Sequence, residues 1–163
     1  MKKITTTPAR GIELVEGALG QSLQSVTRYL FGVAQPKDVT GDGMTTLCFD
    51  HTMLSLRSGH NEDFMIVERG PIIQETLDPN YWTQVELSTE TDFSTLIGKK
   101  LCHVDCYTDG FEDVALVFGF DGGKRLAIVL DDTDLLFTSN FDPSQKNSNG
   151  VTPQLRTRIG LSC

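Results

Sequence analysis

The chain has 163 residues, 39% of them hydrophobic and 22% charged, and its formal net charge is −8. These values are typical of one globular domain that buries a core without disulfide or metal staples. No apolar run approaches the roughly 20 residues of a transmembrane helix, and the negative charge disfavours nucleic acid as a partner.

Each half of the chain is expected to begin with a short helical segment. Ile12, Val15 and Leu19 recur at three- and four-residue spacing, which is typical of one helix face over residues 12–19. A similar stretch at 91–98 precedes the second half, and a glycine ends each one.

The segments that follow have β patterning. Strands are predicted from residue 23 onward, although residues 23–30 also fit a helix, and then near 46–50, 53–58, 63–68, 100–107, 113–120, 125–130 and 134–138. Asp121-Gly122-Gly123 predicts a hairpin turn, and residues 131–134 predict another. Loops are expected at 33–45, 69–91 and 139–155, with a short strand near 85–87.

One eleven-residue template occurs twice, at residues 19–29 and 97–107. The identical positions are Gly20/Gly98, Leu23/Leu101, Val26/Val104 and Tyr29/Tyr107. We therefore predict a single domain over 1–163, with internal repeats at 12–68 and 91–138 and a polar C-terminal extension at 139–163. The predicted fold is mainly β with short helices (α+β), built from two four-stranded antiparallel units. The alternative is an ordinary meander with similar patterning in both halves.

The stretch Cys102-His103-Val104-Asp105-Cys106 contains residue types that serve metal sites and thiol nucleophiles. On a strand, Cys102 and Cys106 share one face about 13 Å apart, which is too far for a shared metal or a disulfide. We predict buried core cysteines, with His103 and Asp105 as a surface pair on the other face. A small hydrolase using His103 with Asp105 or a cysteine is the enzymatic alternative.

No other motif predicts catalysis or ligand binding. Residues 38–43 begin like a calcium loop, but the twelfth position is Phe49 instead of the required glutamate. P-loop, G-x-G-x-x-G, G-x-S-x-G and H-E-x-x-H patterns are absent. We expect no enzyme activity, no catalytic residue, no metal and no cofactor. Tyr81-Trp82 is interpreted either as a lid over the core or as an interface anchor.

Residues 105–134 carry eight acidic and two basic residues, a net charge of −6. Such a segment attracts basic surfaces, although a solvated acidic face is the simpler explanation. The residues predicted to contact a partner are Asp109, Glu112, Asp113, Asp131, Asp132 and Asp134.

The N-terminus has Lys2 and Lys3 but no apolar segment after them, unlike a secretory signal peptide. We therefore expect a cytoplasmic protein whose four cysteines, at 48, 102, 106 and 163, are reduced thiols.

Leu96-Ile97-Gly98-Lys99-Lys100-Leu101, together with residues 116–126, resembles stretches in the immunity proteins of bacterial toxin systems. Some immunity proteins of contact-dependent growth inhibition are similar in fold to the Whirly single-stranded-DNA-binding proteins, which contain two four-stranded repeats. The resemblance implies a Whirly-like sandwich or barrel, and a basic protein toxin, such as a nuclease, as partner. The alternative it implies is a single-stranded nucleic-acid-binding module, although the Whirly stretch Lys-Gly-Lys-Ala-Ala-Leu is absent. Neither reading implies membrane binding, and neither fixes an oligomeric state.

Overall fold

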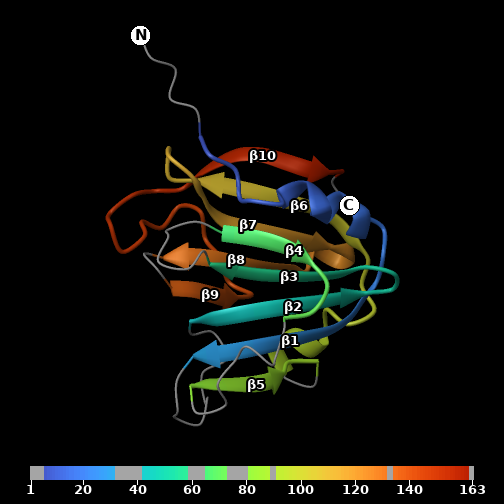
Figure 1. Ribbon diagram of the computed structural model, residues 1–163. Helices are drawn as coiled ribbons and strands as arrows, with labels where there is room; N and C mark the ends of the chain where they lie inside the picture. Colours follow the sequence, from blue (N-terminus) through green and yellow to red (C-terminus); the bar gives the residue numbers. More distant parts are fainter. Residues whose placement is uncertain are drawn as a thin grey trace.

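The computed structural model describes residues 6–31, 42–58, 65–72, 81–88, 91–131 and 134–161. Within these ranges the chain forms ten strands with three short helical segments (Figure 1). No helix in this part of the chain has the length and apolarity needed to cross a membrane.

The strands form two five-stranded antiparallel sheets. The first sheet has the order β4-β3-β2-β1-β5 and contains β1 (Leu23–Phe31), β2 (Gly43–Phe49), β3 (Met53–Ser58), β4 (Met65–Arg69) and β5 (Trp82–Glu86). The second has the order β10-β6-β7-β8-β9 and contains β6 (Leu101–Thr108), β7 (Asp113–Phe120), β8 (Arg125–Asp131), β9 (Asp134–Thr138) and β10 (Gln154–Gly160). The predicted antiparallel β fold is confirmed.

The prediction of four strands per unit is wrong, because a fifth strand joins each sheet beside its first strand. β5 comes from the linker between the halves and pairs with β1. β10 comes from the C-terminal extension and pairs with β6. Both sheets therefore have the same strand order, a four-stranded meander with a returning fifth strand. Whether the halves arose by duplication stays a prediction.

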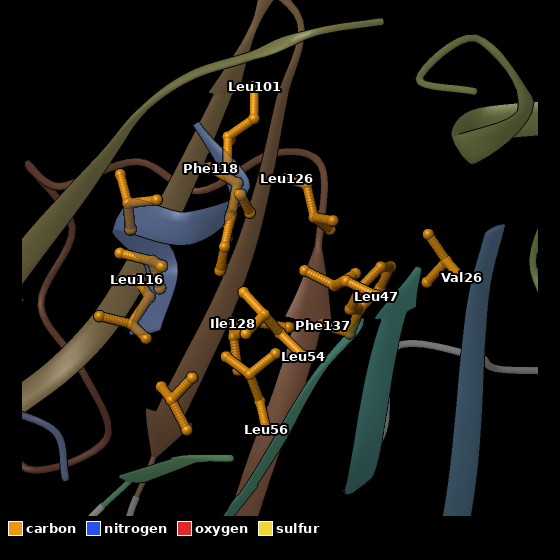
Figure 2. Close-up of a cluster of buried hydrophobic side chains, with 14 of the residues drawn as sticks. Val26, Leu47, Leu54, Leu56, Leu101, Leu116, Phe118, Leu126, Ile128 and Phe137 are labelled. Atoms are coloured by element: carbon orange, nitrogen blue, oxygen red, sulfur yellow. The ribbon is translucent and has the colours of Figure 1, made fainter. Parts of the chain in front are cut away.

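A single apolar core lies between the two sheets. Val26, Leu47 and Leu54 of the first sheet belong to the same buried cluster as Phe118 and Ile128 of the second, and Figure 2 shows these side chains converging. Successive side chains of a strand point to opposite faces of the sheet, so only alternate residues of each strand point into this core. β7 is buried along its whole length, as expected for a strand covered on both faces.

The repeated template lies where the two sheets meet. The Gly20 N–H donates to the Leu101 carbonyl at 2.8 Å, and the Gly98 N–H donates to the Leu23 carbonyl at 2.7 Å. Each bond joins the glycine position of the template in one half to the leucine position in the other, so the two bonds are equivalent. Gly20 and Gly98 have φ of 81° and 83°, in the left-handed region that favours glycine. These backbone requirements account for the two identical glycines.

The helical segments are shorter and tighter than expected. Residues 12–19 form a 3₁₀ helix, η1 (Ile12–Ala18), and the second half begins with the single turn α1 (Thr91–Ser94). Another 3₁₀ turn, η3 (Asp121–Gly123), makes the predicted hairpin between β7 and β8. Residues 38–41 of the calcium-like segment 38–43 lie outside the described residues.

Candidate functional site

Two of the acidic turns lie at the same end of the second sheet. β6 to β9 form an antiparallel meander, so the β6–β7 and β8–β9 connections leave the sheet at one end and the β7–β8 turn leaves at the other. With strands about 4.8 Å apart, the two connections are separated by about 10 Å. We call this region the acidic end; its described carboxylates are Asp42, Asp109, Glu112, Asp131 and Asp134.

Backbone and hydroxyl donors hold several of these carboxylates in place. Oδ1 of Asp109 accepts the backbone N–H groups of Phe111 at 2.8 Å and Glu112 at 3.0 Å, an Asx-type turn. Asp131 accepts the hydroxyl of Ser148. The turn geometry therefore presents the charges at fixed positions, which lowers the entropy lost on binding.

Asp42 belongs to this end although sequence reasoning did not include it. Its Oδ1 accepts the Leu135 N–H at 2.8 Å, which brings it beside Asp134, an exposed residue at the start of β9. Asp42 lies 93 residues from Leu135 in the chain, so no local pattern indicates the contact. Asp132, the other residue predicted in this turn, lies outside the described residues.

The prediction that Asp113 contacts a partner is wrong, because its side chain is buried. Its two oxygens accept bonds from Arg156 at 2.7 and 2.8 Å, and Oδ2 also accepts the Ala9 N–H at 2.9 Å. Asp113 is the first residue of β7 and lies beside a break in the β6–β7 register, which turns it inward. Asp113 therefore forms a structural ion pair with Arg156 of β10 and also holds the N-terminal segment through Ala9.

His103 and Asp105 do lie near each other, but Asp105 is committed to Arg158. The Asp105 carboxylate accepts two bonds from the guanidinium, at 2.6 and 2.8 Å, whereas His103 Nε2 is 3.8 Å from Asp105 Oδ2. The imidazole lies against Gly119, where an added Cβ would be 2.3 Å from Nε2. Packing against Gly119 therefore positions the His103 ring. The engagement of Asp105 by Arg158 weakens the hydrolase alternative.

The cysteines do not supply a nucleophile for that alternative either. Burial raises the pKa of the Cys106 thiol to about 12, so this group is protonated at neutral pH. Cys102 is disulfide-bonded, whereas Cys48 and Cys106 are free. The expectation of reduced thiols is therefore wrong for Cys102, and Cys102 is only half-buried.

A nucleic-acid-binding module would use basic side chains such as Lys99, Lys100, Arg156 and Arg158, and the two arginines are engaged within the fold. Arg156 and Arg158 both make two-pronged ion pairs with carboxylates of the second sheet. Lys99 and Lys100 are exposed, just before β6. Within the described residues, a nucleic-acid-binding surface built on these four side chains would therefore depend on Lys99 and Lys100.

Tyr81 and Trp82 lie at the edge of the first sheet instead of over the core. Trp82 is half-buried, and its ring meets the Phe31 ring edge-on at 5.3 Å between centroids. Tyr81 and Phe31 are 55% and 59% exposed, so the lid interpretation is not supported.

A cleft of about 380 Å³ lies between the outer face of β7–β9 and the segment 139–153. Its apolar surface comes from Ala115, Val129 and Leu136 on the sheet and from Phe141 and Pro153 on the segment. The ring of Phe141 is held by Tyr107, at 5.1 Å between centroids. The segment predicted as a polar loop is therefore the wall of a cleft.

In the part of the chain that the structure describes, no three His, Cys, Asp or Glu side chains gather as they would around a metal ion. Comparison with protein-family models, with curated proteins and with solved structures gave no match.

Proposed function

We propose that the protein is a non-catalytic binding protein of the immunity type, which neutralises a basic protein toxin through the acidic end. The observation that carries the proposal is the gathering of two acidic turns at one end of the second sheet. The carboxylates of Asp109 and Asp131 form no ion pair with other described residues, so their charge is available to a partner.

The toxin class follows from charge complementarity. Nucleases hold phosphates with lysine and arginine side chains, and a fixed set of carboxylates competes for the same groups. A net charge of −8 adds long-range attraction toward a cationic protein and speeds the encounter. A nuclease-type toxin is therefore the partner that this surface fits best.

A Whirly-like single-stranded nucleic-acid-binding module is the second candidate. The repeated strand order of the two sheets favours it, since Whirly proteins also contain two similar units. The fifth strand in each sheet departs from that plan. Arg156 and Arg158 are engaged in ion pairs, which leaves Lys99 and Lys100 as its described cationic groups.

A cytoplasmic location is part of the immunity proposal when the toxin is a nuclease that acts on cytoplasmic nucleic acid. The Cys102 disulfide weighs against that location, because disulfides are rare in reducing compartments. The redox state of Cys102 therefore tests the proposed cytoplasmic location directly.

The function is tested by affinity capture from the native host with the full chain as bait. We expect a basic protein to be retained, and we expect its toxic activity to be inhibited by one equivalent of the chain. A bait carrying Asp109→Lys, Asp131→Lys and Asp134→Lys should lose the partner. A control bait with Glu13→Lys, Glu16→Lys and Asp121→Lys has the same net charge and should retain it, because Glu13 and Glu16 are on η1 and Asp121 is in the turn η3, so none of them is a carboxylate of the acidic end.

Retention of single-stranded oligonucleotide by the wild-type chain, lost on Lys99→Ala/Lys100→Ala substitution, would instead favour the Whirly-like module. Capture of a basic protein whose activity the chain leaves untouched would contradict the immunity proposal.

A further inference from the structure

The cleft beneath the segment 139–153 has the dimensions and lining of a small-molecule site. Its volume of about 380 Å³ lies within the range of about 300–1,000 Å³ that is common for such sites. It reaches the acidic end, because Asp131 both lines the cleft and belongs to the β8–β9 turn.

The apolar lining offers a flat surface and one aromatic ring. Val129 and Leu136 remain half-buried at the floor, whereas Ala115 next to them is fully buried. The small Ala115 side chain leaves room above the sheet. Phe141 forms the opposite wall and is fixed by its edge-on contact with Tyr107. Aromatic faces attract organic cations as well as apolar groups.

The charged groups of the cleft favour a cation. Asp131 and Asp142 line it together with one lysine, Lys146. Asp142 accepts both the N–H and the hydroxyl of Ser144, at 2.9 and 2.7 Å, and these bonds lower its pKa, so it is ionised at neutral pH. Asp142 and Lys146 are exposed at the rim, where solvent screens them, whereas Asp131 is half-buried in the wall.

We propose that this cleft binds a small organic cation, with its apolar or aromatic body on Val129, Leu136 and Phe141 and its protonated amine at the Asp131 carboxylate. The Ser148 hydroxyl, which donates to Asp131, holds this carboxylate at the mouth of the cleft. The inference does not depend on the toxin partner, and either proposal can fail without the other.

The test uses three probes of one shape and different charge: 2-phenylethylamine, 2-phenylethanol and phenylacetate. Each is titrated into the ¹⁵N-labelled full chain, and amide shifts are followed by NMR. We expect saturable shifts at Val129, Leu136 and Phe141 with the amine, weaker binding of the alcohol, and the weakest binding of phenylacetate. Asp131→Asn should weaken amine binding about tenfold, since one charge-assisted bond is lost, and leave the alcohol unchanged.

Two further variants make the result specific. Asp121→Asn removes the same charge from the opposite end of the sheet and should leave amine binding within twofold of the wild type. Leu136→Trp fills the cleft and should abolish binding of both the amine and the alcohol while amide shifts of the first sheet stay unchanged. Val129→Lys places a cation in the floor and should reverse the preference toward phenylacetate, which gives an independent test if the tryptophan variant does not fold.

The proposal is overturned if the amine causes no saturable shift, or if phenylacetate binds the wild type as tightly as the amine. Equal weakening by Asp131→Asn and Asp121→Asn would also overturn it, because that result indicates diffuse attraction to the whole chain.

Discussion

At the scale of single residues, Gly119 is a position where an added methyl group would collide with a side chain, that of His103. A Cβ there would lie 2.3 Å from Nε2 and 2.4 Å from Cε1 of His103. The φ of Gly119 is outside the left-handed region, so alanine meets only this steric conflict. A glycine between apolar residues of a strand indicates a close approach, but the sequence does not say of what.

Gly119→Ala should lower the free energy of unfolding by about 1–3 kcal/mol, as overpacked sites do. In a His103→Ala background the same substitution should change it by less than about 0.5 kcal/mol, because the clashing ring is gone. Urea unfolding followed by circular dichroism measures both. Gly17→Ala is the matched control, since no atom lies within 4 Å of its added Cβ, and it should not destabilise the protein. Equal effects in the two backgrounds would contradict the packing of His103 on Gly119.

Asp109 and Asp113 are four residues apart, and the sequence assigned them the same role. The structure separates them: Asp109 is a half-buried turn residue, and the Asp113 side chain is fully buried against Arg156, which is 23% exposed. Asp113→Asn should lower the free energy of unfolding by about 2–3 kcal/mol, below the full value for a wholly buried pair because Arg156 is partly solvated. Asp109→Asn keeps the accepting oxygen and should change it by less than about 0.5 kcal/mol. Similar losses for both would show that Asp113 is not a buried ion-pair residue.

The raised pKa of the Cys106 thiol makes the free energy of unfolding depend on pH, in a direction that follows from the shift. Its pKa is raised from 9.0 to about 12, first by burial and then by the charge of Asp113. The folded protein therefore holds this proton more tightly than the unfolded chain. The resulting stabilisation is complete below about pH 9 and is lost progressively as the pH rises toward 12.

We therefore expect the free energy of unfolding of the wild type, taken relative to Cys106→Ala, to fall between pH 9 and pH 12. Urea unfolding at several pH values measures this difference, in which the titration of other groups largely cancels. A difference that stays constant across the window would mean that the thiol is not shielded from water.

At the scale of elements, alternation was a sufficient signal for the strands of the two meanders. The strand predicted from residue 23 is confirmed as β1, although residues 23–30 also fit a helix. β10 was not assigned, because Arg156 and Arg158 make its sequence look like a solvated tail. Their carboxylate partners lie 43 and 53 residues earlier in the chain, so the pairing that stabilises this strand is non-local.

The same reasoning limits prediction of the candidate site. The common end of two hairpin turns follows from any antiparallel meander, so the acidic end was partly predictable. The inward position of Asp113 depends on a register shift, and the contribution of Asp42 depends on a contact between sheets. The cleft depends on where the segment 139–153 returns across the sheet, which composition alone does not indicate.

The disulfide of Cys102, on β6, can be tested by counting the free thiols of the protein. Cys102 is disulfide-bonded, and Cys48 and Cys106 are free thiols. Unfolded protein prepared without reductant should therefore react with two equivalents of a disulfide reagent, and with four after reduction. Cys102→Ser should give three. Four thiols without reductant would contradict the disulfide and would restore the case for a reducing compartment.

At the scale of the whole molecule, the distribution of charge connects the fold to the proposed function. Internal ion pairs join Asp105 to Arg158 and Asp113 to Arg156, so these charges stabilise the second sheet. The carboxylates of the acidic end are placed on turns, outside these pairs. The meander thus separates the charges of the internal ion pairs from those of the acidic end, and the acidic end provides long-range attraction that salt weakens.

The association rate constant with the captured toxin, measured at about 20 mM and about 150 mM salt, tests this account most directly. We predict that the Asp109→Lys/Asp131→Lys/Asp134→Lys variant associates at least about tenfold more slowly than the wild type at low salt, and that the gap narrows at the higher concentration. The Glu13→Lys/Glu16→Lys/Asp121→Lys variant, with the same net charge, should stay within about twofold of the wild type. Equal slowing of both variants, or no slowing of either, would contradict the claim that the acidic end recognises the partner.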